Sequence, residues 1–536
     1  MAKETPFPAL PDPVRMIEGL RDTGYKFHTA MADLIDNSVA ANATIIKISV
    51  LMDFKGGLTL FISDNGIGMN KDELNRGMIY GSAPRADPSS LGKFGLGLKT
   101  ASTAFCRRLS VISRNAPDAQ FSKATWDLDY VKKEERWEIL LSEPSTEEIE
   151  HFNDAAENSS GTLVVWEKVD RLLKNYNNPG GGHARNALDR QLKALGQHLA
   201  MVYQRYLDPK DKRTSRKVSM FVQGQQIDTW DPFVAKESDL VASDKVTVEL
   251  DGKRAGVFTI RAYVLPRKED FSDPEVFSEA RIGTQLQGIY VYREDRLIYG
   301  PDWLGMVSKE PHSNLLRVEF SFDHNLDEAF HIDIKKSEII LNQDLYVWLE
   351  DFLTAPRRAA NERYRLGLRK KAKDASVGAH DGSNVNIHSK EAALSTSNIE
   401  VLNEKKGEVL VENKEGQVRL KITLSKPTKP GEFHVQPLAE LDDGMLWQPA
   451  LIDLHKAVQI NTGHPYYYKV YVPNLSNGNT VQGMDSLLWA LCMAELGTVN
   501  EATKDYFVEM RYEVSKLLRR LVEDLPDPDE EEEPEV

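Results

Sequence analysis

The chain has few cysteines and no long apolar run. Its 536 residues include only Cys106 and Cys492, which lie far apart in the sequence. Two isolated thiols can form neither a disulfide framework nor a thiolate metal site, so we expect a cytoplasmic protein in a reducing compartment. The first residues lack the apolar stretch of a signal peptide, and no run of 18 apolar residues occurs. We therefore expect no membrane-spanning segment.

Basic residues are also in the minority. The sequence has 67 lysines and arginines against 82 aspartates and glutamates, a net charge of −15. Such a balance argues against nucleic acid coating the whole surface, although it allows a local basic patch. Residues 526–536 form an acidic tail that we expect to be disordered. The length indicates about three domains.

Hydrophobic periodicity predicts an α+β chain. Apolar residues at helical spacing predict a helix over 27–41, and β-branched runs predict strands over 44–50 and 58–63. A glycine-punctuated loop is predicted to follow, over 66–97. Farther along we expect a strand at 162–166, helices over 184–207 and 344–370, and short strands at 217–222, 245–250, 257–264, 288–293 and 316–322.

The first of three polar motifs lies on the predicted helix over 27–41. Asp33 and Asn37 are four residues apart and therefore share one helical face. A carboxylate beside an amide can hold a water molecule and a metal ion. A solvated polar stripe would produce the same pattern, so this motif alone does not choose between the two.

The second motif directly follows the strand predicted at 58–63 and contains Asp64, Gly66, Gly68 and Met69. An aspartate at a strand end can accept a hydrogen bond from an amino group such as that of adenine. Glycines let the backbone lie flat beside a ring, and a methionine can pack on the face of that ring. An ordinary turn after a strand has the same composition.

The third motif is rich in glycine and opens a helix. Its glycines free consecutive N–H groups to form an anion-binding nest, to which the helix start adds partial positive charge. Gly92 and Gly97 have the spacing of a P-loop, but Leu98 intervenes before Lys99, so we reject a P-loop. The third glycine of a dinucleotide fingerprint is also missing. The candidate residues are Gly92, Lys93, Phe94, Gly95, Leu96, Gly97, Leu98 and Lys99.

In order and spacing, these motifs resemble the GHKL superfamily of ATPases, and most closely its microrchidia (MORC)-like and bacterial heat-shock-like branch. In that branch the first motif reads acidic-Leu-Ile-Asp-Asn-Ser/Ala, as in 33–38, and the third reads Phe-Gly-x-Gly-x-Lys, as in 94–99. Thr162, entering a strand after a glycine, matches a fourth element. The resemblance implies a two-layer α/β sandwich of the Bergerat type that binds ATP with Mg²⁺.

The resemblance also implies a binding role for each matched residue. Asn37 would ligate Mg²⁺, a hard cation that prefers oxygen ligands. Asp64 would hold the adenine amino group, and Gly68 and Thr162 would complete the base pocket. Residues 92–98 would wrap the phosphates as part of a mobile lid.

Catalysis would depend on Asp33, which the resemblance assigns to orienting and deprotonating the attacking water. The family usually has glutamate here. Because aspartate is one methylene shorter, we expect slow hydrolysis, dependence on lid closure, or partial use of Asp36.

Residues 332–339 resemble a loop that sends a lysine to the γ-phosphate. Lys336 aligns best with that lysine, and Lys335 could take its place.

Residues 288–298 resemble the Gly-Ile-x-x-Tyr-x-x-x-Arg-Leu-Ile strand pair of the ribosomal-protein-like transducer domain that follows the ATP domain in MORC relatives.

Around residues 371–400 the composition changes toward Ala, Ser, Asn, Gly and His, which is typical of a flexible linker. We therefore predict an ATP-binding domain at 1–208, a transducer at 209–365, a linker at 366–404, a mixed C-terminal domain of unknown role at 405–525, and the tail at 526–536.

The function favoured by these resemblances is a slow ATPase that works as an ATP-gated homodimeric clamp on DNA, or in defence against foreign DNA. A protein-remodelling chaperone and an ATP-binding regulator with little turnover stay open as alternatives. We set a sensor kinase aside because it needs a phospho-acceptor histidine on an upstream dimerising helix. Only His28 precedes Asp33.

Overall fold

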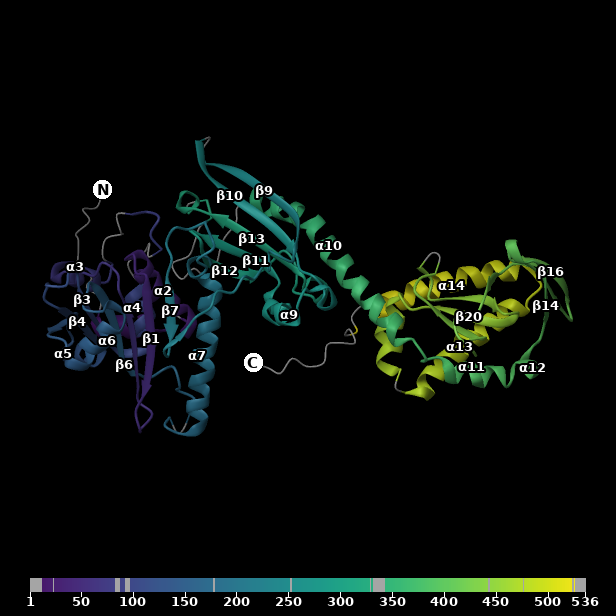
Figure 1. Ribbon diagram of the computed structural model, residues 1–536, viewed down its shortest axis with the longest axis horizontal. Coiled ribbons are helices and arrows are strands. Elements are labelled where there is room, and N and C mark those ends of the chain that lie inside the picture. Colours follow the sequence, from purple (N-terminus) through teal and green to yellow (C-terminus); the bar gives the residue numbers. More distant parts are fainter. Residues whose placement is uncertain are drawn as a thin grey trace, which may run out of the picture. The chain divides into compact units, whose positions relative to one another are not determined.

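A computed structural model divides the chain into two compact units, Met1–Ala360 and Asn361–Val536 (Figure 1). The described residues are 12–22, 24–81, 87–91, 97–176, 179–250, 253–327, 329–330, 343–441, 444–475, 477–522 and 525. The acidic tail predicted at 526–536 lies outside them. Within these ranges, no helix combines the length and the apolar character needed to span a membrane.

The first unit begins with an eight-stranded mixed sheet in the order β5-β4-β3-β6-β2-β1-β7-β8. Neighbouring strands are antiparallel except for β1 and β7, which are parallel. The strands are β1 (Ile45–Met52), β2 (Leu58–Asp64), β3 (Cys106–Arg114), β4 (Ser122–Asp127), β5 (Leu140–Ser142), β6 (Gly161–Val169), β7 (Ser219–Val222) and β8 (Gln225–Gln226). The strands predicted within β1, β2 and β6 are confirmed.

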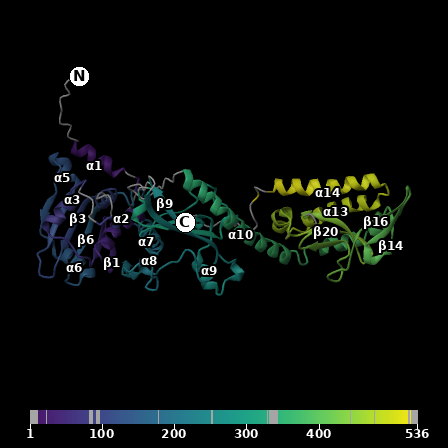
Figure 2. The ribbon, with the colours of Figure 1, turned by 90° about the horizontal axis from the view of Figure 1, so that it is seen from above.

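Helices pack on this sheet according to the alternation of its side chains. In β6, Val164 and Trp166 point into the main core with α2, α4 and α7, whereas Leu163 and Val165 pack with Phe152 of α6 on the other face. The predicted α/β sandwich is confirmed, with α6 added on the second face. The helices are α1 (Pro13–Arg21), α2 (Phe27–Ala40), α3 (Lys71–Met78), α4 (Gly97–Thr103), α5 (Leu128–Glu134), α6 (Thr146–Ala156), α7 (Gly182–Val202) and α8 (Gln204–Leu207). Figure 2 shows α1 beside α5, with which it packs.

Two boundaries differ from the sequence-based prediction. Strand β7 pairs with β1, so the first sheet extends beyond residue 208 and includes residues that the sequence-based prediction assigns to the second domain.

The loop predicted at 66–97 is interrupted by α3. Its N-cap is Asn70, whose side chain accepts from the N–H of Glu73 while the Glu73 side chain accepts from the N–H of Asn70. Such a capping box favours a helix even in a polar segment.

A second sheet follows in the first unit, in the order β12-β11-β13-β10-β9. One face packs against α10 through Leu349 and Leu353, and the other packs Tyr290 and Tyr292 against Phe233. This region was predicted to be the transducer; its likeness to a ribosomal protein stays a prediction. The elements are β9 (Asp239–Leu250), β10 (Lys253–Val264), α9 (Pro274–Ala280), β11 (Gly288–Arg293), β12 (Arg296–Asp302), β13 (Leu316–Phe322) and α10 (Gln343–Ala375).

The flexible linker predicted at 366–404 is wrong, because helices and a strand occupy this segment. Its polar residues are buried and bonded: the His380 ring lies 2.8 Å from Asp485 Oδ2, and Asn384 donates to the carbonyl of Val435 at 2.9 Å. These partners lie far away in sequence, so composition alone could not show them. The elements after α10 are α11 (Asp381–His388), α12 (Glu391–Leu394), β14 (Asn398–Asn403), β15 (Glu408–Asn413), β16 (Gly416–Lys421), β17 (Thr423–Ser425), β18 (Val435–Leu438), β19 (Trp447–Ile452), β20 (His455–Asn461), α13 (Gly478–Gly497) and α14 (Glu501–Leu521).

The second unit contains a three-stranded sheet, β14-β15-β16, and a four-stranded sheet, β17-β19-β20-β18. Its main core joins the four-stranded sheet to the helices, with Trp447 from β19 and Trp489 from α13 among its largest side chains. Helix α14 packs against this core through Met510, Val514 and Leu518.

Candidate functional site

Asp64 ends β2 and is only 5% exposed. Ser38 Oγ on α2 donates to Asp64 Oδ2 at 2.6 Å, and the backbone N–H of Gly66 donates to Oδ1 at 2.9 Å. Burial raises the pKa of Asp64, against the opposing effect of hydrogen bonds from Ser38, Gly66 and the N–H of Thr162. Because a carboxylate has about four acceptor sites, these bonds orient the group and leave capacity for a further donor, such as an amino group.

Ser113 on β3 organises the neighbouring backbone, and no sequence motif pointed to it. Its hydroxyl donates to Gly161 O at 2.8 Å, accepts from the N–H of Met69 at 2.9 Å, and lies 3.0 Å from the hydroxyl of Thr162. Two predicted site segments, the one with Met69 and the one with Thr162, therefore meet at one side chain. The Met69 side chain is half-buried and packs against the main core.

The glycines after Asp64 are required by close backbone contacts. Gly68 has a φ of +65°, and a Cβ on this residue would lie 2.0 Å from the carbonyl oxygen of Arg114. A Cβ on Gly66 would lie 2.8 Å from the carbonyl oxygen of Ala41. Side chains cannot be accommodated at such distances, so packing inside the domain is sufficient to require glycine at both positions.

Asp33 and Asn37 share one face of α2, as predicted. The Tyr25 hydroxyl donates to Asp33 Oδ2 at 3.0 Å, and Asn37 Nδ2 donates to the Asp33 carbonyl at 3.2 Å. The side chain of Asn37 carries an amide oxygen, the kind of ligand that a hard cation prefers. Gly97, the first residue of α4, lies beside this pair: a Cβ there would be 3.8 Å from Asp33 Cβ. The first and third motifs therefore meet.

Several predicted site residues lie outside the described part of the chain. They are Gly92, Lys93, Phe94, Gly95, Leu96, Lys335 and Lys336. Their roles stay predictions. Leu98, which is described, is half-buried against the main core.

Lys99 has a position that the sequence did not predict. Its side chain is buried, and its ammonium group donates to the carbonyls of Gly77 at 2.8 Å and Ile79 at 3.0 Å, at the end of α3. Burial lowers the pKa of Lys99 to about 8. These contacts give Lys99 a structural role in joining α4 to α3, whereas the third motif had assigned it to the nucleotide.

We expect Lys99→Met to lower the free energy of unfolding by about 1–3 kcal/mol, because two partly buried hydrogen bonds from a charged donor are lost. It should weaken ATP and adenosine binding to the same small degree, which calorimetry with a non-hydrolysable ATP analogue and with adenosine can measure. Lys93→Met is the matched control, and it should weaken binding of the ATP analogue only. A selective loss of ATP affinity in Lys99→Met would return this lysine to the phosphate site.

Arg296, the first residue of β12, reaches the acidic residues of α2. Its Nε donates to Asp36 Oδ1 at 3.0 Å, and its Nη2 lies 3.8 Å from Asp33 Oδ1. The Tyr203 hydroxyl donates to the same Asp36 oxygen at 2.7 Å. Burial acts to lower the pKa of Arg296, but Asp36, Tyr203 and Asp33 together outweigh it and raise the pKa. The guanidinium therefore stays charged beside the two carboxylates.

Arg293, at the end of β11, holds the segment before the predicted lid. It pairs with Asp327 at 2.7 and 2.8 Å and donates to the carbonyls of Pro88 at 3.0 Å and Ser90 at 3.3 Å. The second sheet thus contacts both the acidic pair on α2 and the approach to the glycine-rich segment. The sequence contained a signal for this: an arginine within a buried strand requires a buried partner.

Comparison with known proteins identifies relatives of the first sheet and its helices. Residues 25–162 match the family described as Histidine kinase-, DNA gyrase B-, and HSP90-like ATPase. The ATPase MORC2B of Mus musculus is 29% identical over 134 residues, which cover 23% of this chain and 13% of that protein. The chain therefore spans only a small part of the curated relative that it matches.

A solved structure gives a weaker similarity. It is described as the crystal structure of the N terminal domain of a DNA repair protein, and it is 14% identical with a TM-score of 0.39. The match covers 66% of this chain and 98% of the other. A similarity of this size supports no conclusion about fold or function.

Proposed function

We propose that this chain, whose residues 25–162 belong to the histidine kinase-, DNA gyrase B- and HSP90-like ATPase family, binds Mg-ATP beside α2 and hydrolyses it slowly. The buried carboxylate of Asp64 carries the proposal, because Ser38 and Gly66 orient it to accept a further hydrogen bond. The exocyclic amino group of adenine is a donor of the required kind. Gly66, Gly68, Met69 and Thr162 would surround the base.

The other end of the nucleotide would lie toward Asn37, Asp33 and Gly97, which are neighbours in the structure. The Asn37 side-chain oxygen suits Mg²⁺, which supplies charge neutralisation at the phosphates when bound. We propose that residues 92–98 close over the phosphates and that Lys336, or its neighbour Lys335, adds a positive charge near the γ-phosphate.

Asp33 is a better candidate than Asp36 for the base that orients and deprotonates water. Asp36 is 1% exposed, and one of its oxygens accepts from both Tyr203 and Arg296. Asp33 lies beside Gly97 at the start of α4, on the side of the proposed lid. A general base must reach the proton that it removes, which favours Asp33.

Calorimetry with a non-hydrolysable ATP analogue tests the binding site. We expect Asp64→Ala to weaken binding by about 10–100-fold, since an unmatched buried polar contact typically costs about 1–3 kcal/mol. Ser38→Ala is the matched control, because it leaves the carboxylate and removes only one donor that orients it, so its effect should be smaller. Unchanged affinity in Asp64→Ala would place the nucleotide elsewhere.

We further propose that ATP closes two copies of the chain into a cytoplasmic clamp on DNA. The resemblance to the MORC-like branch supports this client. Plasmid DNA should raise the rate of phosphate release, and the effect should fall steeply with salt. Stimulation by an unfolded protein instead would favour a chaperone, and no stimulation by either would favour a regulator. Light scattering with the ATP analogue reports whether the dimer forms.

A further inference from the structure

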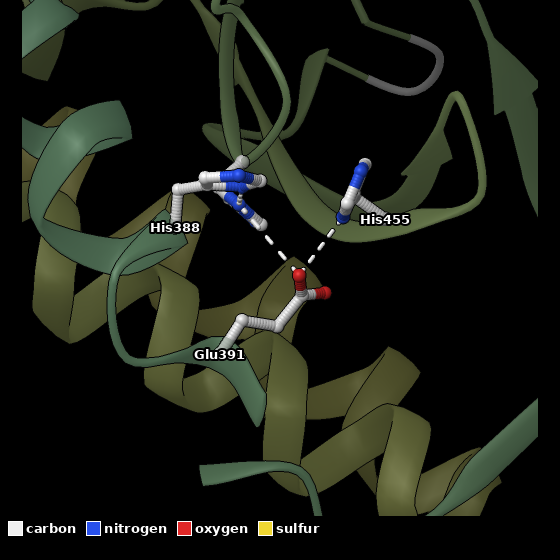
Figure 3. Close-up of side chains that lie close together, drawn as sticks. His388, Glu391 and His455 are labelled. Carbon is white, nitrogen blue, oxygen red and sulfur yellow. Dashed lines mark hydrogen bonds and ion pairs between the residues drawn. The ribbon is translucent and has the colours of Figure 1, made fainter. Parts of the chain in front are cut away.

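Three histidines and one glutamate lie close together in the second unit, whereas the residues of the proposed nucleotide site belong to the first unit. His388, Glu391, His434 and His455 each offer one ligand atom, and these four atoms lie within 4.8 Å of one another. His388 Nδ1 is 3.1 Å from His434 Nε2, and His455 Nδ1 is 2.8 Å from Glu391 Oε2. Figure 3 shows His388, Glu391 and His455 pointing toward one another.

The four residues come from separate segments that the fold brings together. His388 ends α11 and Glu391 begins α12, His434 directly precedes β18, and His455 begins β20. The sequence contains no compact metal motif here, because the histidines are separated by whole secondary-structure elements. Any ion bound to all four would tie α11 and α12 to two strands of the four-stranded sheet.

The distances suit a small tetrahedral ion. Zinc bonds to nitrogen and oxygen of about 2.0–2.2 Å place neighbouring tetrahedral ligand atoms about 3.3–3.6 Å apart. Two observed separations are shorter than this value: 2.8 Å from His455 Nδ1 to Glu391 Oε2 and 3.1 Å from His388 Nδ1 to His434 Nε2. The separation of His434 Nε2 from Glu391 Oε2 is longer, at 3.9 Å. Small side-chain rotations would therefore direct all four atoms to one centre.

His434 is already held in the form that binds a metal. It is fully buried, and its Nδ1 lies 3.1 Å from the carbonyl oxygen of Lys456. Because a carbonyl only accepts, Nδ1 carries the proton and Nε2 presents its lone pair to the cluster. An imidazole fixed through its other nitrogen in this way is typical of metal ligands.

The ammonium group of Lys456, the residue after His455, is directed to other partners. The Lys456 ammonium donates to the hydroxyls of Ser395 at 2.8 Å and Ser397 at 3.0 Å, so it is engaged with other partners. Aromatic rings border the histidines instead, with Phe433 5.0 Å from His455 and Trp489 6.4 Å from His434, measured between ring centroids. The carboxylate of Glu391 lies within ion-pair distance of His434 and His455, so a positive ion among the histidines would meet a negative charge.

We propose that His388, Glu391, His434 and His455 form a binding site for zinc or a similar divalent transition-metal cation. Three imidazoles and one carboxylate match the ligand preference of zinc, whereas Mg²⁺ and Ca²⁺ prefer sites made of oxygen. Four protein ligands complete a tetrahedron, which is typical of a structural rather than a catalytic ion. The site would stabilise the second unit independently of ATP.

The test uses the full chain without nucleotide and without a polyhistidine tag. After treatment with a chelator and reloading with zinc chloride, elemental analysis should find about one zinc per chain, as a single four-ligand site requires. Zinc should also raise the unfolding temperature, because a ligand bound only by the folded state stabilises it. A parent protein that binds no zinc at micromolar concentration would overturn the proposal.

The double variant His388→Ala/His455→Ala removes the two histidines that are at least partly exposed, whose loss disturbs the core least. Competition with a chromophoric chelator should show zinc affinity reduced more than 10-fold, and zinc should no longer raise the unfolding temperature. The matched control is His183→Ala, an exposed histidine of the first unit, which should behave as the parent. Equal zinc affinity in the parent and the double variant would overturn the assignment. If the double variant unfolds at a much lower temperature than the parent without zinc, zinc binding by the parent decides the outcome.

Discussion

Replacing Asp33 by alanine should lower the rate of phosphate release by about 10²–10⁴-fold, the usual contribution of a positioned base. Nucleotide affinity should change little, since Asn37 and Asp64, assigned to Mg²⁺ and adenine, are unaltered. Phosphate release in the steady state and calorimetry with a non-hydrolysable analogue measure the two quantities separately. Hydrolysis at the parent rate in Asp33→Ala would show that another group activates water.

Asp33→Glu is the informative counterpart, because it restores the residue usual in the resembled family. We expect faster hydrolysis if the short side chain limits the rate. Asp33→Asn keeps the shape of the side chain and its contact with Tyr25, so a loss of turnover there separates the charge from the packing. Equal rates in the glutamate variant and the parent would show that carboxylate reach does not limit turnover.

Replacing Arg296 by methionine should produce the largest loss of stability. The buried carboxylate of Asp36 would lose its cation, and breaking a buried ion pair in this way typically costs about 3–5 kcal/mol. Urea denaturation of the parent and the variant measures the change. Turnover should also fall, because the second sheet would lose its direct contact with the acidic residues of α2.

Two controls separate charge from packing. The double variant Arg296→Met/Asp36→Leu should recover much of the lost stability, since replacing both partners of a buried pair is often neutral. Tyr203 keeps an acceptor there, the carbonyl of Ala32 at 2.7 Å. Arg267→Met breaks a surface pair with Asp270 and should cost at most about 1 kcal/mol. If Arg296→Met lowers the free energy of unfolding no more than Arg267→Met does, the Arg296–Asp36 pair does not stabilise the fold as the structure implies.

The sequence alone was sufficient for several elements around the proposed nucleotide site and for the order of its motifs. Helix α2 and strands β1, β2 and β6 follow from apolar periodicity within each segment. The placement of Asp33 with Asn37 follows from helical geometry. Each of these features depends on residues within a few positions of one another, which is why local patterns predict them.

Only the tertiary structure decided which distant segments meet. Ser38 and Asp64 are 26 positions apart and Arg296 and Asp36 are 260 apart, and no local pattern encodes either contact. The pairing of β7 with β1 and the burial of α11 likewise depend on strand register and on packing against distant elements. The same holds for the four metal-ligand candidates, because three separate segments supply them. Side-chain chemistry along the chain determined what each residue could bind, and long-range packing determined which residues act together.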